Sequence, residues 1–307
     1  MEEGMRLWAN PSSPHAEGRK AKAALEDARA RVKRALGWQG ELIFTSGASE
    51  ALALGLGRSR ATRQIVSAVE HDAVFRAAPG AEIFADDLVI DANTIVAVQH
   101  VNSETGVVHP VGAMAQAVQA DGALMMSDCS QSAGRLPLPD ADMLVISAHK
   151  FGGPIGIGAL LVRDYTLLEP VGGHERGYRQ GTENLPGAMG MAAALEAGAW
   201  LTTAEQRAQF ARAMEPTALT IGDQVDYIFA LVHPALSAQA LLIRLDAMGF
   251  AVSAGSACSS GTLKKSRVLD AFGVDDETAS RTVRVSLGWS TTPQELERFA
   301  SAWKALA

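Results

Sequence analysis

Short apolar segments, most of them ending in polar residues, alternate with helical patterns along the first two thirds of the chain. This alternation is typical of an α/β fold with a mainly parallel sheet. The candidate strands are Leu42–Thr45, Ile65–Val69, Ile95–Val101, Leu124–Ser127, Met143–Ser147 and Gly158–Val162. Because the carboxyl ends of parallel strands meet at one edge of a sheet, we expect the polar residues that follow these strands to gather there.

Five polar clusters follow the candidate strands. They are Ser46-Gly47-Ala48-Ser49, Glu70-His71, Asn102-Ser103-Glu104, Asp128 and the run from Ser147 to Lys150. Open α/β sheets bind their ligands at the carboxyl ends of the strands. The five clusters therefore predict one ligand-binding site at this edge.

Composition excludes several classes of protein. The chain has 307 residues and a net charge of -7, so the basic excess that general nucleic-acid binding uses is absent. No apolar run approaches the roughly 20 residues that a membrane span needs. The first residues, MEEGMRLWANPSS, lack the apolar core of a signal peptide. We therefore expect a cytoplasmic protein that does not bind membranes.

The chain is long enough for two domains. We expect a large domain over residues 10–202 and a smaller α+β domain over residues 203–307, with residues 202–223 polar and irregular. The last helix is predicted to open at Thr292, where Thr at the N-cap, Pro at N1 and Glu295 at N3 form a capping box.

Two segments suggest chemistry. The segment Ser147-Ala148-His149-Lys150 ends an apolar strand, and a lysine there can bond covalently to an aldehyde cofactor. Cys258 lies in a loop of small residues, Ser253 to Gly261, where a thiolate would be a mobile nucleophile. The only other cysteine, Cys129, is expected to be inert packing. Two cysteines are too few for a disulfide framework or a Cys-rich zinc site, and we expect no metal site.

The sequence resembles the cysteine desulfurases, members of the class V aminotransferase family. The resembling segments occur in the family's order, at residues 10–15, 44–50, 70–71, 101–106, 127–132, 147–150, 172–184, around Cys258 and at 284–288. The resemblance implies the type I (aspartate aminotransferase-like) fold, with a mainly parallel sheet in the large domain and a smaller α+β domain.

The resemblance also implies pyridoxal 5′-phosphate (PLP) as the cofactor. Lys150 matches the lysine that binds the PLP aldehyde, and Asp128 matches the carboxylate that keeps the pyridine nitrogen protonated. His71 resembles the histidine that stacks on the ring, and Gln131 the side chain near its phenolic oxygen. Taken singly, such residues are more often surface, capping or structural residues.

The cofactor phosphate is expected at Gly47-Ala48-Ser49. This turn lies between a strand and a helical run, so Ala48 and Ser49 offer backbone N–H groups and a hydroxyl. The resemblance adds Ser147 and His149 to this set. It also implies that Thr182 reaches the phosphate from a second subunit, which makes the expected working unit a homodimer.

The substrate residues follow from the same resemblance. Asn102 matches a residue that contacts cofactor and substrate. Arg284 matches the arginine that pairs with the substrate α-carboxylate, a role that suits its planar fork, although a surface arginine at a strand edge is the alternative. Cys258 resembles the persulfide-forming cysteine of the subgroup with longer mobile loops.

The implied activity is conversion of L-cysteine to L-alanine with a persulfide on Cys258. The sulfur would pass to an acceptor or scaffold protein in iron–sulfur cluster or thio-cofactor synthesis. One alternative is a selenocysteine lyase or another class V aminotransferase. The other is a catalytically weak PLP-binding regulatory or partner subunit, because only nine residues precede Asn10, where the family has a further strand and substrate-lining segment, and because residues 202–225 are abbreviated.

Overall fold

The structure is a computed structural model that describes the chain except for residues 8, 86, 199, 255–265 and 307. The chain forms two compact units, one of Met1–His100 with His109–Gly198 and one of Val101–Val108 with Ala199–Ala307. The chain therefore passes between the units at three points. The domain boundary expected near residue 203 stays a prediction.

The first unit contains a sheet of seven described strands in the order β1-β7-β6-β5-β4-β2-β3. Strand β7 is antiparallel to both of its neighbours, β1 and β6, and the other neighbouring strands are parallel. The mainly parallel sheet predicted from the sequence is thus confirmed, whereas β3 was not predicted. The strands are β1 (Glu41–Thr45), β2 (Arg63–Val66), β3 (Glu82–Ile83), β4 (Thr94–Ala97), β5 (Leu124–Asp128), β6 (Met143–Ser147) and β7 (Gly158–Val162).

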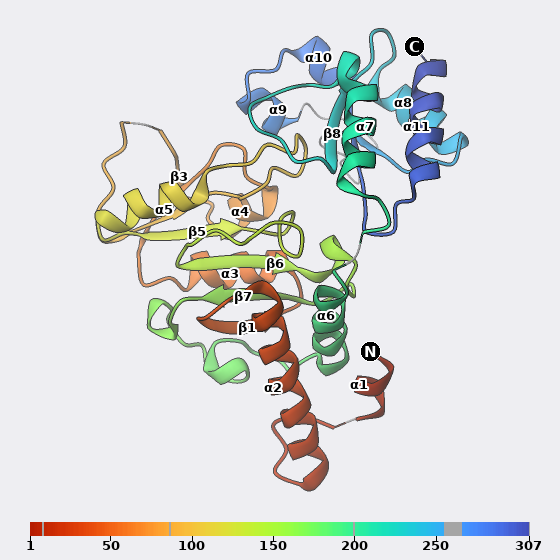
Figure 1. Ribbon diagram of the computed structural model, residues 1–307. Coiled ribbons are helices and arrows are strands. Elements are labelled where there is room, and N and C mark those ends of the chain that lie inside the picture. Colours follow the sequence, from red (N-terminus) through yellow and green to blue (C-terminus); the bar gives the residue numbers. More distant parts are fainter. Residues whose placement is uncertain (8, 86, 199, 255–265, 307) are drawn as a thin grey trace. The chain divides into compact units, whose positions relative to one another are not determined.

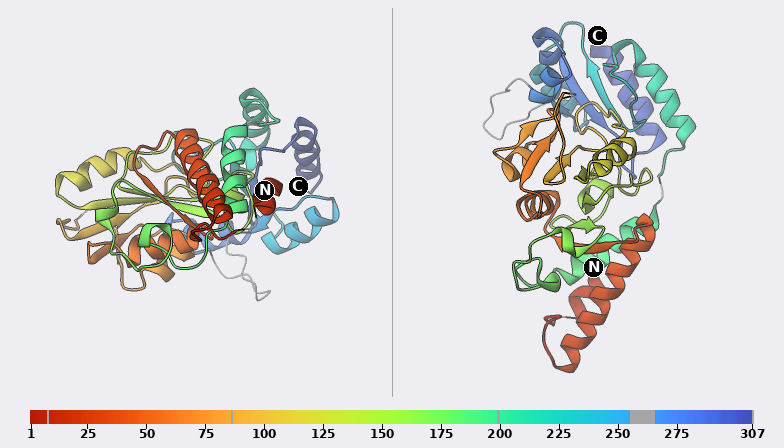
Figure 2. Two further views of the ribbon diagram at one scale, coloured as in Figure 1. Left: turned by 90° about the horizontal axis from the view of Figure 1, so that it is seen from below. Right: turned by 90° about the vertical axis from the view of Figure 1, so that its left-hand side faces the viewer.

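Helices cover both faces of this sheet (Figure 1). Successive side chains of a strand point to opposite faces, so Leu42 and Phe44 of β1 pack in one core and Ile43 packs in the other. In both views of Figure 2, α2 (red) runs alongside α6 (green). The first face carries α2 (Ala16–Leu36), α5 (Val111–Ala120) and α6 (Leu185–Ala197), and the second carries α3 (Ala48–Gly57) and α4 (Asp72–Ala77).

Short helices complete the first unit. Helix α1 packs on α6, since a Cβ added to Gly4 would lie 2.7 Å from Pro186 Cα. Single 3-10 turns follow several of the strands. These elements are α1 (Glu2–Arg6), η1 (Ala148–Phe151), η2 (Tyr165–Leu167) and η3 (Glu175–Gly177).

The second unit has a three-stranded antiparallel sheet in the order β8-β10-β9. Its core is aromatic, with Phe210, Phe229 and Phe299 packed edge-on or tilted against one another. In the part of the chain that is described, no helix is long and apolar enough to cross a membrane. The elements are α7 (Ala204–Met214), η4 (Glu215–Thr217), β8 (Ile228–Val232), α8 (Ala238–Ala247), β9 (Ser253–Ala254), α9 (Arg267–Ala271), α10 (Asp276–Ser280), β10 (Thr282–Ser286) and α11 (Pro293–Leu306).

The expectation that residues 202–223 are irregular is wrong, because α7 lies within them. Thr203 caps this helix through a complete capping box, in which its Oγ accepts from Gln206 N at 3.2 Å and Gln206 Oε1 accepts from Thr203 N at 2.9 Å. The capping box predicted at Thr292 is confirmed by the matching bonds with Glu295, at 2.8 and 3.2 Å.

A buried ion pair covers the outer edge of β1. Arg29 of α2 and Glu175 are only 5% and 4% exposed, and their side chains are joined by bonds of 2.7 and 3.2 Å. Arg29 also donates to Leu42 O at 2.6 Å, and Glu175 accepts from Phe44 N at 2.9 Å. The pair therefore satisfies backbone groups that an edge strand leaves without a partner.

We predict that Glu175→Gln lowers the free energy of unfolding by about 3 kcal/mol, because it removes the buried partner of Arg29 and leaves only the more exposed Glu26, 3.3 Å from Arg29 Nε, to balance the charge. Chemical denaturation measures this loss. The control is Glu196→Gln, which breaks a more exposed pair with Arg31 and should cost about 1 kcal/mol or less. Equal losses in the two variants would contradict the role assigned to the buried pair.

Candidate functional site

The register of four strands brings polar residues together at one edge of the sheet. Thr45 of β1 is opposite Gly158 of β7, and Gly158 is opposite Ser147 of β6. On the other side of β6, Asp128 of β5 is the register partner of Val145. The turn after Thr45, the η1 turn after Ser147 and the carboxylate of Asp128 therefore all lie at this edge, as the sequence predicts.

The turn at Gly47 has the form of an anion-binding cradle. Gly47 is the N-cap of α3 at φ 155°, a backbone conformation that favours glycine, and no side chain caps the helix. Gly158 fits against it so closely that a Cβ on Gly158 would lie 2.7 Å from Gly47 Cα. The first N–H groups of a helix have no partner within it, so those of Ala48 and Ser49 suit a phosphate.

Ser147 and His149 lie next to this turn. Ser147 Oγ is 3.7 Å from the position that a Cβ on Gly47 would occupy, and it is hydrogen bonded to His149 Nδ1 at 3.0 Å. Loss of hydration and then the charge of Lys150 lower the pKa of His149, so its ring is neutral at pH 7. These two side chains therefore extend the donor set of the cradle.

Lys150 lies in the η1 turn that follows β6. Ala148 and Phe151 of this turn are buried, and the carbonyl oxygen of Lys150 accepts from Arg135 Nη2 at 2.7 Å. The turn ends at Gly152, and the Lys150 side chain is partly exposed. The backbone of the predicted aldehyde-binding lysine is thus held on both sides.

Asp128 is placed to bind a ring nitrogen. Its Oδ1 accepts from Ser130 N at 2.8 Å, and Oδ2 has no hydrogen-bond partner among the described residues. The strand is held from both sides, since Asp128 O also accepts from His100 N at 3.0 Å. Gln131, the residue expected near the phenolic oxygen, follows in the same turn and is half-buried. The free carboxylate oxygen suits a pyridinium N–H.

His71 lies at the same edge, after β2. Its Nδ1 accepts from Ala73 N at 3.1 Å, so it is the N-cap of α4 and carries its proton on Nε2 when neutral. The ring is exposed. The preceding Glu70 is buried and accepts from Gln99 N at 2.6 Å, which fixes the loop that carries His71. The geometry leaves an exposed ring that could stack on a planar ligand.

Thr182 is exposed, and its segment is tied to the phosphate turn by residues that the sequence analysis missed. Arg179 Nε donates to Glu50 Oε1 at 2.9 Å, and Glu50 Oε2 accepts from Ser46 N at 2.5 Å. The sequence feature that could have indicated this role is Glu50 at N3 of α3, a helix position at which a carboxylate often accepts a backbone N–H before the helix.

Asn102 and Arg284 belong to the second unit. Asn102 is buried, and its Oδ1 accepts from Glu104 N, Thr105 N and Thr105 Oγ1 at 2.9 to 3.0 Å. Arg284 of β10 donates to Ser103 O at 3.0 Å, so the two predicted substrate residues meet at one turn.

The Arg284 guanidinium retains an unused donor. Its Nε is buried without a hydrogen-bond partner among the described residues, while Nη2 donates to Ser253 Oγ at 3.0 Å. Burial lowers the pKa of Arg284, and the charge of Glu104 opposes this shift. A buried arginine with an unsatisfied N–H suits a carboxylate ligand.

Cys258 lies outside the described residues. The residues that flank its segment are described, and both are bound near Arg284. Ser253 accepts the bond from Arg284 Nη2, and Ser266 Oγ donates to Glu104 Oε2 at 2.6 Å. Ser253 and Ser266, which come before and after the residues that are not described, are thus each bonded to a group around the predicted carboxylate site.

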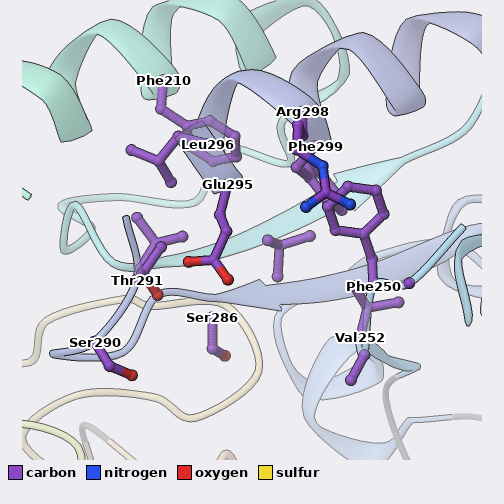
Figure 3. Close-up of a pocket in the computed structure, with 14 residues that line it drawn as sticks. Phe210, Phe250, Val252, Ser286, Ser290, Thr291, Glu295, Leu296, Arg298 and Phe299 are labelled. Carbon is purple, nitrogen blue, oxygen red and sulfur yellow. The ribbon is translucent and has the colours of Figure 1, made fainter. Parts of the chain in front are cut away.

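The second unit also contains a cavity of about 230 Å³ between β10, α11 and the end of α8 (Figure 3). Its walls include Phe210, Phe250 and Phe299, and Arg298 lies over the Phe250 ring at 5.5 Å. None of the predicted cofactor or substrate residues lines it. Among the described residues, no group of three or more His, Cys, Asp or Glu side chains is placed to hold a metal ion.

The chain is similar to known proteins over most of its length. Residues 1–299 match the family model described as Aminotransferase class-V. A cysteine desulfurase of Cereibacter sphaeroides is 33% identical over 95% of this chain and 86% of its own length. A NifS-like protein of known structure has a TM-score of 0.85 at 27% identity, covering 99% of this chain and 94% of that one. The structure of SspA in complex with cysteine has a TM-score of 0.79 at 27% identity, covering 95% of each chain.

We predict that Cys129 does not react with iodoacetamide in the folded protein at mildly alkaline pH. The thiol is fully buried, and burial raises its pKa to about 12, so almost no thiolate forms. Mass spectrometry of the Cys129 peptide, before and after unfolding in guanidinium, measures this difference. Rapid labelling of Cys129 in the folded protein would show that the prediction is wrong.

Proposed function

The chain belongs to the class V aminotransferase family, and from this premise we propose that it is a cysteine desulfurase that uses PLP. The type I fold, the enzyme class and the cofactor that the sequence predicts are confirmed by the family match and by the NifS-like structure. A relative named cysteine desulfurase and the cysteine complex of SspA support L-cysteine as the substrate.

One observation carries this proposal. A glycine-capped helix start, a lysine turn and a carboxylate with a free oxygen lie at the carboxyl ends of β1, β6 and β5, at one edge of one sheet. These groups match the three parts of PLP that need a partner: the phosphate, the aldehyde and the ring nitrogen. No single one of them is specific, but their shared edge is what a PLP site requires.

The bound cofactor supplies an electron sink that stabilises negative charge on the substrate Cα. The Ala48 and Ser49 N–H groups, with Ser147 and His149, hold the phosphate. Asp128 Oδ2 would accept a hydrogen bond from the protonated ring nitrogen and so keep that nitrogen protonated. The Lys150 amine would hold the cofactor aldehyde, and it is the residue to which we assign the role of general base for the Cα proton of cysteine.

The other reactive groups are the predicted substrate residues and Cys258. Arg284 binds the cysteine α-carboxylate, and Asn102 fixes the adjoining turn. The Cys258 thiolate attacks the substrate sulfur, so an S–S bond forms and the C–S bond breaks with its electron pair left on carbon. Protonation of that carbon gives L-alanine, and Cys258 carries the persulfide. Cysteine and one protein thiol thus become alanine and one protein persulfide.

Three further points belong to the proposal. The working unit is a homodimer in which Thr182 reaches the cofactor of the partner subunit. The persulfide sulfur passes to an acceptor or scaffold protein for iron–sulfur cluster or thio-cofactor synthesis. The cytoplasmic location expected from the sequence stays a prediction.

We predict that the purified protein binds PLP with a visible absorbance band and converts cysteine to alanine. Lys150→Ala should abolish the band, because the amine that holds the aldehyde is lost. Cys258→Ser should keep the band and lose nearly all alanine formation, because no thiolate accepts the sulfur. Absorbance spectra and amino-acid analysis measure these results.

The matched control for this experiment is Cys129→Ser, which should keep both the band and the activity, with a stability loss of about 1 kcal/mol or less. A colourless wild type that takes up no PLP would refute the proposed function. Full activity in Cys258→Ser would instead favour a selenocysteine lyase or aminotransferase.

We also predict that Thr182→Ala raises the PLP dissociation constant by about tenfold, the effect of losing one hydrogen bond to a charged group. Equilibrium titration of the apoprotein measures this constant, and light scattering measures the mass. A monomer with full activity and unchanged PLP affinity in the variant would argue against the dimeric site.

A further inference from the structure

We propose that Glu50 is a positioning residue that holds the phosphate-binding turn next to the Arg179–Asn184 segment, and that retention of PLP requires Arg179 to neutralise the Glu50 carboxylate. The inference rests on the proposed function, since it takes PLP as the ligand. It adds a role for two residues that are not expected to touch the cofactor or the substrate.

Glu50 uses both of its carboxylate oxygens. Oε2 accepts from Ser46 N, at 2.5 Å, just before the Gly47 turn, and Oε1 accepts from Arg179 Nε at 2.9 Å. Arg179 in turn donates from Nη1 to Gly181 O at 3.2 Å, immediately before Thr182. One carboxylate thus connects two backbone segments that lie far apart in the sequence.

The turn depends on this support. Gly47 has no side chain, Ala48 has no polar group, and no side chain caps α3 at its N-cap. The bond from Thr45 Oγ1 to Gly47 O, at 3.0 Å, fixes the carbonyl side of the turn. Glu50 fixes the residue before the turn, because its carboxylate accepts the backbone N–H of Ser46. Without it, the N–H groups that bind a phosphate would lose their fixed direction.

The charge of Glu50 creates a second requirement. A carboxylate close to a phosphate site repels the ligand unless a cation neutralises it. Burial alone would raise the pKa of Glu50, but the bonds from Ser46 and Arg179 lower it overall, so Glu50 is ionised at pH 7. Arg179 is therefore needed to cancel this charge as well as to hold the segment.

These two roles predict an unequal response to mutation. Glu50→Gln removes the charge but keeps an oxygen that can accept from Ser46 N, so its effect should be small. Arg179→Gln leaves the Glu50 charge uncompensated beside the phosphate, so its effect should be large. In the double variant the harmful charge is gone, and affinity should recover.

The experiment is equilibrium titration of apoprotein with PLP, followed by absorbance. We expect Arg179→Gln to raise the PLP dissociation constant by about tenfold or more, within the range of coupling between contacting charged groups. Glu50→Gln and the double variant should stay within about threefold of each other and closer to wild type. Arg179→Lys, which keeps the charge, should rescue most of the loss.

The control is Glu196→Gln, which breaks the ion pair with Arg31 between α2 and α6 at 2.6 Å and should leave PLP affinity unchanged. Melting temperatures of the apo forms separate a positioning effect from unfolding. If no double-variant recovery occurs, or if Arg179→Gln binds PLP normally, the role of Glu50 is wrong. If wild-type apoprotein binds no PLP, the proposed function is wrong and this inference falls with it.

Discussion

The close packing of Gly158 against the Gly47 turn is the constraint on which the site depends. A Cβ on Gly158 would lie 2.6 Å from Ile146 O and 2.7 Å from Gly47 Cα, so no larger residue fits without moving backbone. This contact lets the last residues of β1 and β6 and the first residue of β7 form one row. The start of α3 and the hydroxyl of Ser147 consequently face the same small space, and the lysine turn follows directly.

Two ion pairs anchor the same loop with different physical characters. The Arg29–Glu175 pair is buried. In the loop that carries it, Glu175 and Arg176 have φ values of 49° and 59°, a conformation that costs about 1–3 kcal/mol for each non-glycine residue. The Arg179–Glu50 pair is more exposed to solvent, with the two side chains 18% and 28% exposed. The first pair fixes where the loop starts on the sheet edge. The second directs its end toward the ligand-binding turn.

Much of the fold could be predicted from the sequence, because apolar strands and amphipathic helices have clear periods. The strands that form the centre of the sheet were each expected within a few residues of their observed bounds. Strand β3 was missed because its two residues are exposed and carry no apolar pattern. Helix α7 was missed because a polar surface helix has a weak apolar stripe, although its capping box was present in the sequence.

The candidate site was predictable only where a residue type has a recognised chemistry. Lys150, Asp128 and the Gly47 turn could be named because lysines, carboxylates and glycine-capped helix starts have direct roles in cofactor binding. Glu50 and Arg179 could not, because the value of an ion pair depends on two segments whose meeting is decided by tertiary structure. Cys258 was also named from its chemistry, but it lies outside the described residues, so its predicted position stays a prediction.

The passage of Val101–Val108 out of one unit and into the other has a consequence for how the chain is made. In the second unit, Val108 N donates to Asp223 O at 2.8 Å and Gln224 Nε2 donates to Thr105 O at 2.7 Å. During translation, Asp223 and Gln224 are synthesised more than a hundred residues after the Val101–Val108 segment that they bind. During synthesis the segment can therefore form only its internal bonds, such as Asn102 N to Val107 O, before Asp223 and Gln224 are made, and neither unit corresponds to one continuous fragment.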